Sequence, residues 1–178
     1  MKKYWYKTAM LVMALGVFTA CSDDDGPKIP EGPIALVNGA YVINTGNWNE
    51  NNGTIQWYDR DLKTVSADLF AAANGAGIGD AQDLCVYGTK IYITCSSSAK
   101  IEIVDRKDFK RIKTLNLTNE SGQPIQPRYM TAAKGNIYFT AYDGTVSQID
   151  TTSLSITKKI EVGGSHPEAL TSANGKLY

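Results

Sequence analysis

The sequence predicts an all-β chain built from the four-stranded antiparallel blades of a β-propeller. Two markers recur together along its 178 residues. A glycine turn followed by an apolar-Tyr-apolar strand appears as NGAYVI, GTKIYIT, GNIYFT and GKLY, with its glycines 49, 47 and 40 residues apart. An alternating strand closed by aspartate appears in phase as IQWYD, IEIVD and VSQID, at intervals of 46 and 45 residues. Four short strands in a period of about 45 residues are typical of a propeller blade.

The composition supports a folded β protein and excludes an all-helical one. The chain holds 16 glycines and 10 tyrosines, and 43% of its residues are apolar. Such a composition is typical of a globular protein with short strands and tight turns. The 18 basic side chains (Lys+Arg) are balanced by 18 acidic ones. Because a nucleic-acid-binding surface needs a basic excess, no nucleic-acid partner is expected.

The first twenty residues indicate a lipoprotein signal peptide. Three lysines precede the apolar run TAMLVMALGVFTA at residues 8–20, which is shorter than the roughly 20 residues of a transmembrane helix. The run ends in FTAC, which resembles a bacterial lipobox with Cys21 as the lipidated first residue of the mature chain. An ordinary cleaved signal with an incidental Cys21 is the alternative. The acidic stretch SDDD that follows resembles the export signal of surface lipoproteins, so we expect a cell-surface protein anchored in the outer membrane.

The chain is expected to divide into a signal, a tether and a partial propeller. Residues 1–20 form the signal, and residues 21–33, rich in acid, proline and glycine, form a flexible tether. The propeller covers residues 34–178, with repeats near 39–87, 88–134 and 135–174 and a fourth that begins at 175. Propellers close with about four to eight blades, so we expect an N-terminal fragment of a seven-bladed protein. A plain β-sandwich is the alternative, although it does not require every hairpin to repeat the same side chains.

Cys85 and Cys95 are expected to remain free thiols, although an oxidising compartment permits disulfides. With a two-residue turn that starts at Gly88, the register pairs Cys85 with Tyr92 and Gln82 with Cys95, so the thiols point to opposite faces of the sheet. The chain has one histidine and no CxxC motif, and this argues against a zinc site.

The connections between strands alternate between two faces of each blade. One face carries tight turns, where Asp59, Asp105 and Asp150 are expected to form the turns at strand ends. The other face, called the loop face, carries longer connections that are rich in amides, glycine and aromatic residues. These connections are residues 44–53, 74–83, 96–99, 119–128, 142–144 and 163–168. Because binding residues collect in loops on a rigid scaffold, the loop face is the predicted binding face.

Several polar and aromatic residues of the loop face are candidates for ligand binding. They are Asn47, Trp48, Asp80, Gln82, Arg128, Tyr142 and His166. The indole of Trp48 offers a flat surface on which a ligand can stack, or else it caps the blade core. Arg128 is suited to a bidentate bond with a phosphate or carboxylate, or else it forms an inter-blade salt bridge with Asp83 or Glu168.

Three of the other candidates also have two interpretations each. His166 either contacts a ligand or is a solvated loop residue, and Asp80 and Gln82 either bind a ligand or form a turn. The sequence contains no nucleophile elbow, no HExxH motif and no EF-hand loop, and a lone histidine gives no catalytic triad. We therefore expect a binding protein without a cofactor, rather than an enzyme.

The repeats resemble those of YncE-like, YVTN-type propellers, also described as surface-layer proteins. In those propellers a proline near the inner strand, here Pro127 and Pro167, precedes a hairpin of the NGKLY type. The resemblance covers residues 35–178. In the first repeat Gln82 follows Ala81 in place of the proline, so the innermost strand there is expected to be set differently.

The lipobox, the NTGNWNENNG loop and the GIGDAQD and QPRYM segments also resemble the lipoprotein propellers of gut bacteria that capture cobalamin at the cell surface.

This resemblance implies a cell-surface lipoprotein that binds a ligand on its loop face. The specific expectation is a corrinoid, passed on to a TonB-dependent outer-membrane transporter. Two other classes stay open. A propeller enzyme of the lyase type would need His, Glu or metal ligands from blades beyond residue 178, whereas a surface-layer or adhesion protein would need no small ligand.

Overall fold

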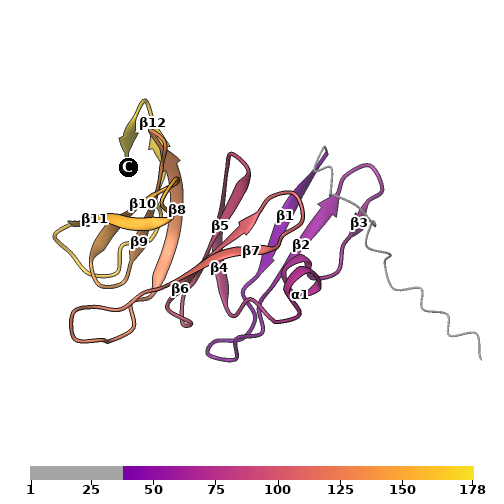
Figure 1. Cartoon of the computed structure of the whole chain (residues 1–178), viewed down its shortest axis with the longest axis horizontal. Helices are drawn as coiled ribbons and strands as arrows, with labels where there is room; N and C mark the ends of the chain where they lie inside the picture. The colour runs from indigo at the N-terminus through magenta and orange to yellow at the C-terminus, as the bar shows by residue number, and fades with distance from the viewer. Residues whose placement is uncertain (1–37) are drawn as a thin grey trace, which may run out of the picture.

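The computed structural model describes residues 38–178 as a row of antiparallel sheets (Figure 1). Blade I contains β1 (Gly39–Asn44), β2 (Thr54–Asp59) and β3 (Thr64–Val65). Blade II contains β4 (Ala81–Tyr87), β5 (Lys90–Cys95), β6 (Lys100–Asp105) and β7 (Arg111–Asn116). Blade III contains β8 (Pro127–Ala133), β9 (Asn136–Ala141), β10 (Thr145–Asp150) and β11 (Ser155–Glu161). A two-stranded sheet of β12 (Ser172–Ala173) and β13 (Lys176–Leu177) follows.

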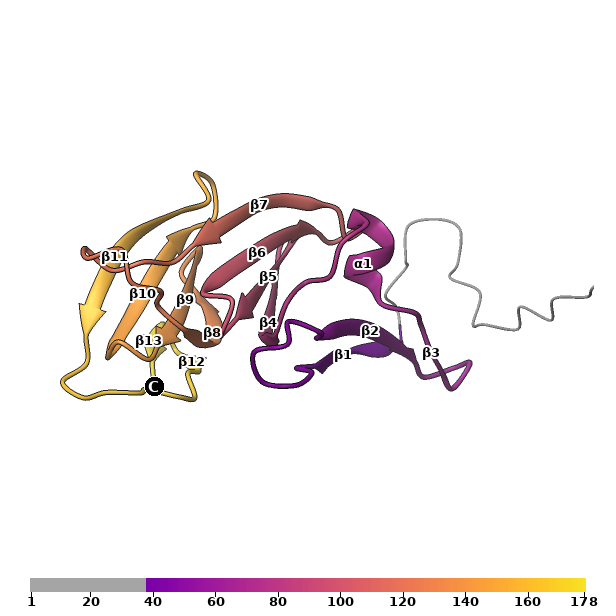
Figure 2. The same cartoon turned by 90° about the horizontal axis from the view of Figure 1, so that it is seen from below.

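The sheets confirm the predicted fold class, a β-propeller of four-stranded antiparallel blades. In blades II and III each strand pairs with the next one along the chain, so the strand order in the sheet is the order in the sequence. Two views show the blades side by side in chain order, from indigo blade I to the yellow C-terminal strands (Figures 1 and 2). The expected lipoprotein signal and tether fall outside the described residues.

A short helix that the sequence pattern did not indicate, α1 (Leu69–Asn74), connects blade I to blade II. The Asp68 carboxylate caps its first turn by accepting a hydrogen bond from the Phe70 amide at 3.1 Å. Gly75 ends the helix with a φ of 66°, a left-handed conformation that suits glycine. Leu69 and Phe70 are buried, so the helix covers the core beside the very short β3. In the described part of the chain, no helix is long and apolar enough to cross a membrane.

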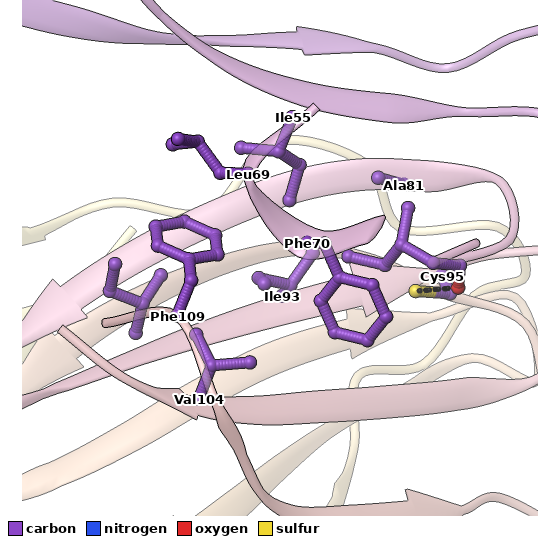
Figure 3. Close-up of a cluster of buried hydrophobic side chains, with 10 residues drawn as sticks. Ile55, Leu69, Phe70, Ala81, Ile93, Cys95, Val104 and Phe109 are labelled. Carbon is purple, nitrogen blue, oxygen red and sulfur yellow. Dashed lines mark hydrogen bonds between the residues drawn. The ribbon is translucent and has the colours of Figure 1, made fainter. Parts of the chain in front are cut away.

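Two apolar cores hold successive blades together. The core between blades I and II is drawn in Figure 3 and consists of Ile55, Leu69, Phe70, Ile78, Ala81, Ile91, Ile93, Cys95, Val104 and Phe109. The core between blades II and III consists of Tyr92, Ile101, Ile103, Leu117, Met130, Ile137, Phe139, Ala141, Ile149 and Leu154. Strand β5 supplies both cores, because successive side chains of a strand point to opposite faces. Its pattern is apolar on both faces because each face of blade II is covered by a neighbouring blade.

Cys85 and Cys95 are free thiols on opposite faces of blade II, as predicted. Burial raises the pKa of Cys85 to about 11 and the pKa of Cys95 to about 12. The predicted pairing of Cys85 is confirmed, but that of Cys95 is wrong. Cys95 lies opposite Ala81 rather than Gln82, because the register shifts between Ala81 and Asp83.

The three recurring aspartates form turns, as predicted. The Asp59 carboxylate accepts hydrogen bonds from the amides two and three residues further on, both at 2.9 Å. Asp105 accepts one from the amide two residues further on at 2.7 Å, and Asp150 accepts two at 3.0 and 2.6 Å. Hydrogen bonds from Ser153 hold the pKa of Asp150 below its ordinary value. The aspartate marker of the repeat therefore reports the tight turn between the last two strands of each blade.

Candidate functional site

Equivalent residues of three successive inner segments meet on the loop face. Gln82, Arg128 and Glu168 occupy the same position of the repeat, six residues before the first residue of the following two-residue turn, which is Gly88, Lys134 or Asn174. In β4 and β8 the strand pairing shifts register at this position. A bulge of this kind re-aims a side chain at the edge of a sheet. Because the shift occurs in both blades, the different setting expected from Ala81 in place of a proline is not found.

In blades II and III, a buried threonine of the second strand holds the next inner segment. The Thr94 hydroxyl oxygen accepts a hydrogen bond from the inner-strand amide of its own blade at 3.0 Å, and its hydroxyl donates to the Arg128 carbonyl at 2.7 Å. Blade III repeats this arrangement. The Thr140 hydroxyl oxygen accepts a hydrogen bond from the Tyr129 amide at 3.0 Å, and its hydroxyl donates to the Glu168 carbonyl at 2.8 Å. These bonds fix the backbone from which the Arg128 and Glu168 side chains project.

Arg128 is the centre of a polar cluster, called the Arg128 cluster, of Gln82, Ser96, Arg128, Tyr142, His166 and Glu168. Its Nη1 donates to Gln82 Oε1 at 2.9 Å, and its Nε donates to Glu168 Oε2 at 3.0 Å. Its guanidinium carbon lies 4.8 Å from the centre of the Tyr142 ring. The Arg128 side chain is 13% exposed. The guanidinium is therefore held by blade II, blade III and the segment that follows blade III.

Tyr142, His166 and Glu168 form the outer part of the cluster. The Tyr142 hydroxyl donates to Glu168 Oε1 at 2.6 Å, and this bond raises the pKa of Tyr142. Burial acts to raise the pKa of Glu168, but the hydrogen bonds from Tyr142 and Arg128 outweigh it and hold this pKa below its ordinary value. The His166 ring lies 4.6 Å from the Tyr142 ring, with 57° between their planes. The cluster thus combines an ionised carboxylate, a guanidinium and two aromatic rings.

Four of the candidate residues therefore come together, namely Gln82, Arg128, Tyr142 and His166. Of the two interpretations of Arg128, the inter-blade salt bridge to Glu168 is the one observed. The Asp83 carboxylate instead accepts a hydrogen bond from the Met130 amide at 2.7 Å. Since the charge of Arg128 is already paired, the cluster offers hydrogen-bonding groups beside flat rings rather than a bare cation. Among residues 38–178, no group of three or more His, Cys, Asp or Glu side chains is arranged to hold a metal ion.

Glu168 was not among the candidate residues, although the sequence contains a signal for it. It stands at the repeat position of Gln82 and Arg128, directly after the proline of its inner segment. Comparing that position across repeats would have found it. Ser96, whose hydroxyl lies 3.5 Å from Arg128 Nη1, carries no such signal.

Asp80 supports the turn at residues 96–99 instead of facing the solvent. It is buried, and its carboxylate accepts hydrogen bonds from the amides and hydroxyls of Ser97 and Ser98. Burial acts to raise the pKa of Asp80, but these hydrogen bonds outweigh it and hold the pKa below its ordinary value. The Asp80 carbonyl also accepts a hydrogen bond from the Ser96 amide at 3.2 Å. Asp80 therefore holds in place one member of the Arg128 cluster.

Asn47 and Trp48 lie in the loop between β1 and β2. Asn47 Nδ2 donates to Glu50 Oε2 at 2.8 Å, which orders the loop. Trp48 is 59% exposed, so its indole does not cap the core. The Ser98 hydroxyl of blade II donates to Asn51 Oδ1 at 2.7 Å and ties the loop to the next blade. An open pocket of about 480 Å³ lies here, lined by Asn51, Gly77, Gly79, Ser98 and Lys100.

Comparisons with known proteins establish the family and the fold. A family model described as "Domain of unknown function (DUF5074)" matches residues 38–178. No curated protein matches the sequence. Among solved structures, the chain is similar to the WD40 β-propeller domain of Doa1, with 15% identity and a TM-score of 0.53, over 73% of this chain and 43% of that one. It is also similar to the dihydro-heme d1 dehydrogenase NirN in complex with DHE, with 13% identity and a TM-score of 0.52, over 71% and 26% of the two chains. The chain thus spans less than half the length of either structure, and the likeness concerns the fold alone.

Proposed function

This chain belongs to the family defined by the domain of unknown function DUF5074, and from that premise we propose that it is a cell-surface lipoprotein that binds a ligand on its loop face. The observation that carries the proposal is the Arg128 cluster, where side chains from three successive inner segments converge. Its charged groups are paired with one another, an arrangement that suits recognition rather than catalysis. A rigid scaffold that presents a few convergent polar groups beside aromatic rings is typical of a binding site.

The ligand class that we propose is a corrinoid, a large and nearly flat macrocycle with amide groups on its rim. Tyr142 and His166 offer aromatic surface for the macrocycle, and Glu168 and Gln82 offer oxygen acceptors for the rim amides. The exposed indole of Trp48 offers a further stacking surface on the same face. The sequence resemblance to cobalamin-capturing lipoproteins supports this class. The proposed partner is a TonB-dependent outer-membrane transporter that receives the ligand.

We expect the full-length protein to bind cyanocobalamin in a calorimetric titration. Trp48→Ala and His166→Asn should each weaken binding by about 1 to 3 kcal/mol, the range of a binding hot spot. Both side chains are exposed, so the melting temperature should change little. Asparagine is the better replacement for His166, because it tolerates the left-handed backbone at φ 57°.

Asp105→Asn is the matched control for this titration, because Asp105 lies at a turn on the opposite face. The affinity of the Asp105→Asn variant for cyanocobalamin should equal that of the wild type. Absence of binding at high micromolar cyanocobalamin would rule out the corrinoid, and unchanged affinity in both Trp48→Ala and His166→Asn would rule out the loop-face site.

The lipoprotein part of the proposal rests on residues 1–25, which lie outside the described residues. We expect metabolic labelling with an alkynyl fatty acid to mark the wild-type protein and Cys85→Ser, but not Cys21→Ser. Protease treatment of intact cells should release the propeller, because we place it outside the outer membrane. Label retained by Cys21→Ser, or a propeller protected in intact cells, would contradict this part of the proposal.

A further inference from the structure

One position of the blade is filled by a long polar side chain in blades I and II but not in blade III. It is the third residue before each turn aspartate, and it is Gln56 in β2, Glu102 in β6 and Ser147 in β10. Gln56 Oε1 accepts a hydrogen bond from Asn44 Nδ2 at 2.9 Å, and Gln56 Nε2 donates to the Ser66 carbonyl at 3.0 Å. Both ends of the Gln56 amide are therefore hydrogen-bonded inside blade I.

Glu102 fills the same position of blade II with a buried carboxylate. It is 1% exposed and accepts hydrogen bonds from Lys100 Nζ at 2.8 Å, Arg111 Nε at 2.9 Å and Thr114 Oγ1 at 2.7 Å. Burial acts to raise the pKa of Glu102, but these bonds outweigh it and hold the pKa below its ordinary value. Blade II thus has a carboxylate-binding site that its own side chain occupies.

Blade III has a pocket where blade II has the Glu102 carboxylate. Ser147 is 5% exposed, and its hydroxyl forms no hydrogen bond with any residue of the described chain. The strand register gives the blade III counterparts of the three side chains that bind Glu102. Thr145 stands in place of Lys100, Ile156 in place of Arg111, and Lys159 in place of Thr114. Ser147 and all three counterparts line a pocket of about 180 Å³ between blades II and III. Its walls are Asn116, Leu117, Thr118, Ile125, Phe139, Asp143, Thr145, Ser147, Ile156 and Lys159.

The pocket places one ion pair beside an apolar wall. Lys159 Nζ lies 2.8 Å from Asp143 Oδ2, and the Thr145 hydroxyl donates to Asp143 Oδ1 at 2.7 Å. Burial acts to raise the pKa of Asp143, but the bonds from Lys159 and Thr145 outweigh it and lower this pKa. The bond to Asp143 raises the pKa of Lys159, so both groups are charged at neutral pH. The apolar side chains of the lining are Leu117, Ile125, Phe139 and Ile156, of which Leu117 and Phe139 are buried.

We propose that this pocket binds a small zwitterion with an apolar side chain, of the size and chemistry of an aliphatic α-amino acid. The ligand carboxylate takes the place that the Glu102 carboxylate holds in blade II, and Lys159 and Ser147 donate to it. The ligand ammonium pairs with Asp143, and the apolar side chain lies against Phe139 and Ile125. A pocket with few convergent polar groups and an apolar wall is the usual form of a small-molecule site. This site is separate from the Arg128 cluster and stands without the corrinoid proposal.

Three probes with the same branched hydrocarbon body test the charge of the ligand. They are leucine, 4-methylpentanoate and 3-methylbutylamine, titrated at millimolar concentrations into the full-length protein by calorimetry and by thermal shift. We expect leucine to bind and to raise the melting temperature, since a ligand that binds only the folded state stabilises it. The acid and the amine should bind at least about tenfold more weakly. Equal binding of either one would overturn the assignment to a zwitterion, and no binding of leucine would overturn the site.

A variant that copies blade II tests the place of the ligand. Ser147→Glu puts a carboxylate back where Glu102 stands and should abolish leucine binding, while Asp143→Asn should weaken it by about tenfold. Leu62→Ala, at an exposed turn of blade I outside the pocket, is the control and should keep the wild-type affinity. If Ser147→Glu does not fold, Ser147→Gln, which copies Gln56 of blade I, replaces it. Undiminished leucine binding in the folded variant would overturn the proposal.

Discussion

Phe70→Ala is expected to lower the free energy of unfolding by about 3 to 5 kcal/mol, the cost of truncating a large side chain in a packed core. Phe70 is fully buried between blades I and II, among the side chains drawn in Figure 3. The Arg111 guanidinium carbon also lies 5.1 Å from the centre of its ring. Helix α1 has only six residues and is attached to the core by its buried side chains. It therefore has few other side chains that could move into the cavity left by the truncated ring.

Urea unfolding of the full-length protein, followed by circular dichroism, measures this loss. Leu62→Ala is the matched control, because Leu62 is 71% exposed and its truncation should change the free energy of unfolding by no more than about 0.5 kcal/mol. Equal effects of the two substitutions would mean that α1 does not contribute to the core as described.

Glu102→Gln is expected to lower the free energy of unfolding at neutral pH by about 1 to 3 kcal/mol, because it leaves two cations without their carboxylate. The side chains of Lys100 and Arg111 are 19% and 38% exposed. Solvent therefore screens part of the loss, which should remain below that of a fully buried ion pair. Glutamine keeps the size of the side chain, so the change reports the charge rather than the packing.

The pH dependence of this difference follows from the pKa of Glu102. The folded state holds this pKa below the ordinary value of 4.5. The Glu102 carboxylate therefore contributes its stability above that value and loses it as the pH falls through the lower, folded-state pKa. The difference between wild type and Glu102→Gln should be constant from pH 7 to about 5 and shrink below pH 4.5. A difference that does not change down to acid unfolding would contradict the lowered pKa.

The propeller fold could be predicted because its signals are short-range. Each strand is an alternation of a few residues, and each turn aspartate bonds to amides two or three residues further on. The opposite orientation of Cys85 and Cys95 followed from the same alternation. One residue of bulge was enough to make the predicted partner of Cys95 wrong, because side-chain alternation alone does not reveal an inserted residue.

The candidate site could be predicted only as a face of the molecule. The loop face follows from counting strand crossings, but which of its residues meet depends on how blades pack. Arg128 contacts Gln82 and Glu168, which are 46 and 40 residues away in the sequence. The two interpretations of Trp48, as a core cap or as an exposed ring, have the same local sequence and differ only in what lies above the loop.

The sequence by itself determined the repeat, its strands and its turns, because these depend on hydrogen bonds and side-chain alternation within a few residues. The tertiary structure alone decided that Arg128 is paired, that Asp80 is enclosed by a serine turn and that α1 covers a core. It also decided that the space beside Ser147 is a pocket, whereas the space beside Glu102 is filled. These features depend on the fit between neighbouring blades, where side chains distant in sequence share one space and only their combined volume and charge determine what is filled, paired or left open.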